Sequence, residues 1–106
     1  MAKYLYIFAY QTPEQRHAVA AHGPAEESSA AVFIEADSAE EALAWGREIS
    51  EAFLRHLLHD PAVSWKGLNF AHWVENDPRQ EYPADILARL PVVPRGSFPD
   101  FALFQH

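Results

Sequence analysis

Two histidines three residues apart, His56 and His59, could ligate a metal. On a helix this spacing places two imidazoles at neighbouring positions of one surface, which is compatible with a transition-metal site. No third or fourth ligand accompanies them, and the H-E-x-x-H order that pairs two ligands with a base is absent. Histidine near a helix C-terminus is also favoured by the helix dipole. The sequence therefore predicts a structural role for the pair, with no metal and no cofactor.

Carboxylates form a second candidate cluster. Glu35 and Asp37 share one face of a predicted strand, and Glu40 and Glu41 follow closely. Such a group could bind a hard cation or act as an acid–base pair. A simpler interpretation is that Asp37 caps a helix and that the glutamates interact with the positive end of its dipole. We expect the start of a helix at this place.

His72 is a third candidate, because it lies in an aromatic segment and could act as a buried general base. A structural histidine with one ring nitrogen bonded to a carbonyl is the commoner arrangement. The chain has no cysteine and no G-x-S-x-G elbow, and its four glycines are too far apart for a phosphate loop. We therefore expect a non-enzymatic protein. The alternative is a small enzyme or ligand-binding protein with a pocket near His72, His56 and Trp73.

The charge of the chain is acidic and regional. The net charge is −7, and residues 11–60 hold ten acids against three bases. This sign repels phosphate backbones, so the sequence predicts a basic protein partner and no nucleic acid. No apolar run approaches the roughly 18 residues that cross a bilayer, and the first run is too short for a signal segment. We expect a cytoplasmic chain with no membrane association.

The length of 106 residues fits a single domain, 1–106, that can fold without disulfides. Alternating or continuous apolar residues predict strands at 3–10, 30–36 and 65–75. A capping pattern and a broad apolar stripe predict a long helix over 38–60, and a proline introduces a short helix at 84–90. Residues 13–22 fit a short helix as well as an irregular connection. Prolines predict an irregular aromatic tail over 91–106.

These elements predict an α+β fold, with a small sheet of about three strands and one long helix packed on one face. The passage from Phe33 to Trp45, FIEADSAEEALAW, is similar to the strand-plus-acidic-helix element of small ferredoxin-like α+β proteins. A ferredoxin-like arrangement is therefore one variant of the expected fold. The resemblance consists mainly of capping residues and indicates no particular family.

The first strand has two apolar faces, one with Leu5 and Ile7 and the other entirely aromatic. We expect the long helix to cover the Leu5 face, which leaves the aromatic face to the C-terminal tail or to a second copy of the chain. The expected function is a protein-interaction domain that binds a basic protein or forms a homodimer. The predicted partner-binding residues are Tyr4, Tyr6, Phe8, Tyr10, Glu26, Glu27, Glu35, Glu40 and Glu41.

Overall fold

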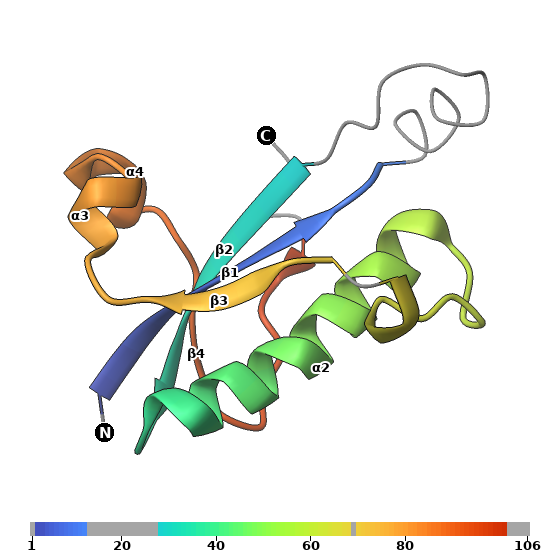
Figure 1. Ribbon diagram of the computed structural model, residues 1–106, viewed down its shortest axis with the longest axis horizontal. Helices are drawn as coiled ribbons and strands as arrows, with labels where there is room; N and C mark the ends of the chain where they lie inside the picture. Colours follow the sequence, from blue (N-terminus) through green and yellow to red (C-terminus); the bar gives the residue numbers. More distant parts are fainter. Residues whose placement is uncertain (1, 13–27, 69, 102–106) are drawn as a thin grey trace.

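The computed structural model describes residues 2–12, 28–68 and 70–101, and a four-stranded sheet forms the centre of this part (Figure 1). The strands are β1 (Ala2–Tyr10), β2 (Ser28–Ala36), β3 (His72–Glu75) and β4 (Val92–Pro94). Their order is β3-β1-β2-β4. β1 is antiparallel to β2 and to β3, whereas β4 is parallel to β2. The α+β class is confirmed, with four strands among the described residues in place of about three.

The additional strand, β4, comes from the segment predicted to be irregular. The backbone N–H of Phe33 donates to the carbonyl of Pro91, and the N–H of Arg95 donates to the carbonyl of Glu35, each over 2.9 Å. Prolines cannot donate to a ladder, but they are tolerated in an edge strand, where one side of the backbone has no partner strand. The prolines of this segment therefore confine it to the sheet edge without preventing pairing.

The third predicted strand is shorter than expected, because residues 65–68 turn away from the sheet. Lys66–Leu68 form a 3₁₀-helix, and β3 begins only at His72. The first two strands pair directly with each other as antiparallel neighbours, which differs from the β-α-β-β-α-β order of ferredoxin-like folds. The predicted short helix at 13–22 lies outside the described residues.

Helix α2 (Ala39–Leu58) begins at a capping box, and the predicted long helix is confirmed. The hydroxyl of Ser38 accepts from the N–H of Glu41, and the Glu41 carboxylate accepts from the N–H of Asp37, each over 3.2 Å. The first bond is that of a capping box, whereas the return bond of Glu41 goes to residue 37, immediately before the cap. The cap is therefore Ser38, and the prediction that Asp37 caps the helix is wrong.

The C-terminal end of α2 is a left-handed cap at His59, whose φ is 53°. The N–H of Asp60 donates back to the carbonyl of Arg55 over 3.1 Å, which satisfies one of the last free carbonyls of the helix. Pro61 follows and cannot continue the helix. None of the described helices combines the length and apolar character that a membrane crossing needs.

Helix α2 covers the aromatic face of the sheet, and the prediction that it covers the Leu5 face is wrong. The ring of Phe53 lies 5.6 Å from the ring of Phe8 and 4.9 Å from that of Tyr10, both edge-on. Edge-to-face aromatic pairs bury large areas in a favourable geometry. Gly46 has no side chain, so the Tyr6 ring can lie directly against the helix. These rings form the main core.

The opposite face of the sheet is covered by the segment after β3 (Figure 1). This segment contains two short helices, α3 (Pro78–Glu81) and α4 (Ala84–Leu87). α3 begins at Pro78, and α4 is shorter than the predicted helix at 84–90. The second apolar cluster comprises Leu5, Ile7, Ala31, Phe33, Tyr82, Leu87 and Leu90. Both faces of β1 are therefore buried within the chain.

The described part of the C-terminal tail packs against α2. The indole N–H of Trp45 donates to the carbonyl of Ser97 over 2.8 Å, and the rings of Trp45 and Phe98 lie 5.0 Å apart. Phe101 contacts the ring of Phe53 at 5.7 Å. The tail thus adds to the core beside the helix, although Phe98 itself stays 52% exposed.

Candidate functional site

The aromatic part of the predicted binding surface lies inside the molecule. Tyr6 and Phe8 are fully buried beneath α2, Tyr10 is buried, and Tyr4 is partly buried against the same cluster. The premise that these side chains need a cover from the tail or a second copy is wrong, because α2 supplies that cover. In this structure they contribute to the core and offer little surface to a partner.

The acidic part of the predicted surface is partly neutralised by bases. Glu35 in β2 stands opposite Lys3 in β1, where oppositely charged cross-strand neighbours attract. Glu41 forms an ion pair with Arg95 at 3.1 Å. Glu40 is exposed in the first turn of α2. Two further members of the predicted surface lie outside the described residues, namely Glu26 and Glu27.

The two histidines at the end of α2 have separate surroundings. Their ring centroids are 6.4 Å apart, His59 caps the helix, and His56 packs 5.4 Å from the ring of Phe101. Among the described residues, no group of three His, Cys, Asp or Glu side chains is placed to hold a metal ion. The pair therefore has a capping and packing role in this fold.

His72 is the end of a buried hydrogen-bond chain that the sequence did not suggest. The Tyr6 hydroxyl lies 2.7 Å from Ser50 Oγ and 3.1 Å from Nδ1 of His72. Ser50 Oγ donates to the carbonyl of Gly46 over 2.9 Å, one turn earlier in α2. Ser50 is fully buried, and every buried side-chain polar atom in the described part has a hydrogen-bond partner. The chain links the core of α2 to strand β3.

The titratable members of this chain are neutral near pH 7. Burial raises the pKa of the Tyr6 phenol far above its ordinary value, so it stays protonated. Burial, and then the positive charge of Arg47, lower the pKa of His72 below its ordinary value of 6.5. A neutral imidazole keeps one nitrogen unprotonated, which is the state of a general base or a pH sensor.

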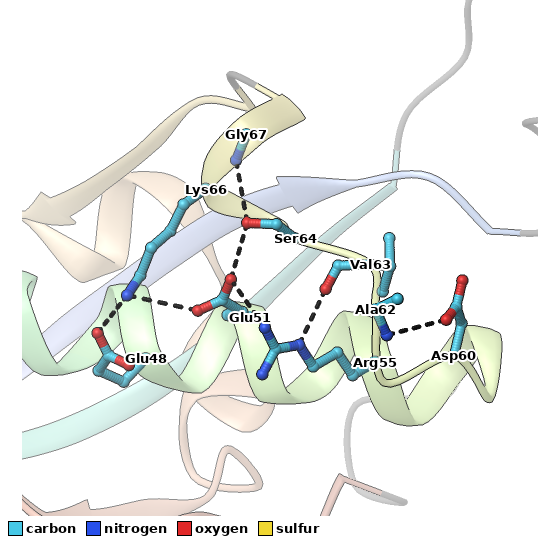
Figure 2. Close-up of polar contacts among 9 residues, drawn as sticks. All are labelled: Glu48, Glu51, Arg55, Asp60, Ala62, Val63, Ser64, Lys66 and Gly67. Carbon is cyan, nitrogen blue, oxygen red and sulfur yellow. Dashed lines mark hydrogen bonds and ion pairs between the residues drawn. The ribbon is translucent and has the colours of Figure 1, made fainter.

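Polar contacts fasten the described part of the segment between α2 and β3 to the helix (Figure 2). Glu51 of α2 accepts a hydrogen bond from Ser64 over 2.8 Å and pairs with Arg55 and Lys66, each at 3.4 Å. Lys66 also pairs with Glu48. Burial alone would raise the pKa of Glu51, but the bonds from Ser64 and Lys66 lower it overall. The loop is therefore tied to the helix by several charges at once.

Trp65 lies within this loop and connects it to the sheet. Its indole N–H donates to the carbonyl of Ala9 over 2.9 Å, and its side chain is almost fully buried. The Trp65 ring meets the His72 ring edge-on at 5.2 Å. His72 is thus oriented by Tyr6 on one side and by Trp65 on the other.

Strand β3 forms an edge of the sheet. The N–H of Ala9 donates to the carbonyl of Ala71 over 2.9 Å, which makes these two a hydrogen-bonded pair of the antiparallel ladder. Such pairs alternate along a strand, so Trp73 bonds inward to β1 while the backbone groups of His72 and Val74 point outward. Among the described residues, no further strand pairs with this edge.

The side chain of Trp73 is exposed next to this edge. Alternation places it on the face opposite His72, where 38% of it is accessible, and its indole N–H donates to Glu75 over 3.2 Å. His56 lies near Phe101 and away from both. The described residues form no pocket, so those named for the alternative function are not gathered around one.

Sequence reasoning identified His72 but missed its partners, because Tyr6 was assigned to a partner-binding face of the first strand and Ser50 to the apolar stripe of the long helix. The only signal for them was a glycine and a serine one helical turn apart on the buried face of the helix. Comparison with known proteins assigns no family or function: no family model, no curated protein and no solved structure matches the chain.

Proposed function

We propose that this chain is a non-enzymatic protein-interaction domain that forms a homodimer by pairing β3 of one copy with β3 of another. The observation that supports the proposal is the edge of β3, which has no further partner strand among the described residues and where the backbone groups of His72 and Val74 point outward beside an exposed Trp73. An unpaired strand edge is a template for another strand. Pairing of this kind supplies main-chain hydrogen bonds and side-chain specificity together.

A two-fold axis at Trp73 gives a self-complementary register. His72 would then stand opposite Val74 of the second copy in a hydrogen-bonded pair. By symmetry, Val74 of the first copy would form the same pair with His72 of the second. The two Trp73 side chains would face each other in the non-hydrogen-bonded pair between them, where side chains approach most closely. Glu75 would stand opposite Ala71, so the register sets no like charges against each other. Pairing would cover the exposed indole of each copy.

The other edge of the sheet is less suited to pairing. β4 has three residues and ends at Pro94, which cannot donate a hydrogen bond.

A basic protein partner is a second proposal, supported by the net charge of −7. Its support is weaker, because Lys3 and Arg95 already lie near Glu35 and Glu41. The charge also argues for a protein partner over nucleic acid, and the absence of cysteine suits a reducing cytoplasm.

The test is the Val74→Pro variant, measured by sedimentation from micromolar to millimolar concentration. Proline removes the outward N–H of residue 74 but leaves the inward bonds of Trp73 intact, and its backbone angle suits an edge strand. The wild type should sediment as a dimer and Val74→Pro as a folded monomer. Val74→Thr is the matched control, since it keeps both the N–H and the β-branched shape, and it should remain dimeric.

A second variant covers the case in which proline disturbs folding. Trp73→Glu changes an exposed side chain and would place two like charges opposite each other at the axis, which destabilises a strand pair. It should also be a folded monomer. A wild type that is monomeric over the whole concentration range, or a dimer that survives both substitutions, would contradict pairing through β3.

A further inference from the structure

The hydrogen-bond chain that ends at His72 has one consistent arrangement of protons. A carbonyl oxygen can only accept, so the Ser50 hydroxyl donates to Gly46. Ser50 Oγ then accepts from the Tyr6 hydroxyl, and the Tyr6 oxygen in turn accepts from the Nδ1–H of His72. His72 therefore carries its proton on Nδ1 when neutral, and Nε2 is the nitrogen that can gain one.

His72 also belongs to the strand that we propose as the pairing edge. In the register with Trp73 on the axis, it stands directly opposite Val74 of the second copy. The apolar side chain and the backbone of that copy would replace water around the imidazole. A charged imidazole loses hydration in such a place and gains no carboxylate, so pairing favours the neutral ring.

We propose that His72 makes association through β3 pH-dependent: acid adds a proton at Nε2, charges the edge strand and separates the two copies. This inference rests on the proposed homodimer and adds its regulation. Two observations support the inference. The His72 ring belongs to the edge strand of the described sheet, and the hydrogen bond to Tyr6 fixes the ring there.

No negative charge acts on His72 from the described elements packed against it. Arg47 of α2 is the charged group that affects it, and it is positive. From β1, Tyr6 is held neutral by burial, which raises its pKa. Trp65 of the loop carries no charge. Glu75 lies on the other face of β3, where it accepts the indole N–H of Trp73. No carboxylate among these groups compensates a charged His72.

The environment of His72 decides whether acid strengthens or weakens association of the two copies. Burial and Arg47 already place the pKa of His72 below 6.5 in the folded chain, and further burial on pairing lowers it again. Association is then strongest above the pKa of His72 in the monomer, weakens as the pH falls from that pKa towards the lower pKa in the dimer, and is constant below the latter. Each unit of lowering weakens binding about tenfold per histidine at acid pH. Two histidines in the interface give about a hundredfold.

The experiment compares the dimer dissociation constant at about pH 7.5 and about pH 5 at constant ionic strength, across the range in which histidine titrates. His72→Asn is the key variant, because its amide can still donate to Tyr6 but does not titrate. We expect the wild type to dissociate on acidification and His72→Asn to associate equally at both values. His56→Asn is the matched control and should keep the pH dependence of the wild type.

The outcomes separate this inference from the proposed function. A dimer of equal strength at both pH values refutes the pH dependence and leaves the homodimer standing. A monomer at both values refutes the homodimer and this inference with it. If His72→Asn fails to fold, ring nitrogen NMR of the wild type decides: the Nδ1–H form must be present at neutral pH, and Nε2 must titrate with the same midpoint as dissociation. A different midpoint, or the Nε2–H form, overturns the inference.

Discussion

Replacing Gly46 with alanine should destabilise the protein, although the same change normally stabilises a helix. In a helix interior alanine is favoured over glycine by about 1 kcal/mol. Here, however, a Cβ atom at position 46 would overlap the ring of Tyr6. That ring cannot retreat easily, because it is fully buried, stacks against Phe8 and is hydrogen-bonded to Ser50. Either the helix or the ring must move.

The expected magnitude follows from these opposing effects. Forcing an extra methyl group into a packed core costs about 1–3 kcal/mol. Displacing the ring would also weaken the hydrogen bond between Tyr6 and Ser50, which contributes about 1 kcal/mol. The gain in helix propensity offsets roughly that last amount. The net loss in the free energy of unfolding should therefore be about 1–3 kcal/mol.

Urea denaturation followed by tryptophan fluorescence measures this loss, provided that the slope of the transition is unchanged. Gly67→Ala is the control, because a Cβ there would lie 3.8 Å from Ser64, an ordinary contact, and should change stability by less than about 0.5 kcal/mol. In a Tyr6→Leu background the cost of Gly46→Ala should shrink, since the overlapping ring is gone. A Gly46→Ala variant as stable as the wild type would refute the argument.

Two further predictions concern α2. Phe53→Ala should lower the free energy of unfolding by about 3–5 kcal/mol, because the ring is fully buried among other aromatic rings, and a loss below about 1 kcal/mol in a denaturant titration would contradict that packing. Combined replacement of His56 by alanine and His59 by glycine, which suits the left-handed backbone at φ 53°, should leave fold and metal content unchanged. Stoichiometric metal in the wild type that disappears from the double variant would show that the pair is a metal site.

The long helix and the first two strands could be predicted because their signals are local. Ser38 and Glu41 stand at capping-box spacing, and the apolar stripe of the helix has a period close to 3.6 residues. Pro61 marks the end one turn after the last stripe residue. Strand pairing depends on alternation and β-branched residues, which Val32 and Ile34 supply.

The arrangement of the faces could not be predicted, because both faces of β1 are apolar. Alternation separates Leu5 and Ile7 from the aromatic residues, but it does not say which set meets α2. The short helices after β3 that cover the Leu5 face have only four residues each, too few for a clear periodicity. Gly46 was the one sequence feature that indicated the aromatic face, since a glycine on the buried stripe of a helix leaves room for a large ring.

The hydrogen-bond chain was beyond sequence reasoning for a different reason. Its bonds join residues 44 and 66 positions apart, and each member has an ordinary local role. Ser50 is a small residue on the buried stripe of the long helix, Tyr6 is an aromatic residue in a strand, and His72 lies in a segment rich in aromatic residues. Only the packing of α2 across β1 and β3 brings the three together.

This packing also explains how β3 can be short and, within the described part of the chain, paired on one side. A strand of four residues with one such neighbour gains few ladder bonds and would be marginal alone. The bond from His72 to Tyr6, and the anchoring of Trp65 on the carbonyl of Ala9, attach β3 through side chains instead. Because these side-chain contacts lie on the face of the sheet that α2 covers, they do not use the outward backbone groups of His72 and Val74. The residue that fixes the strand is therefore the one through which the proposed pairing of β3 would depend on pH.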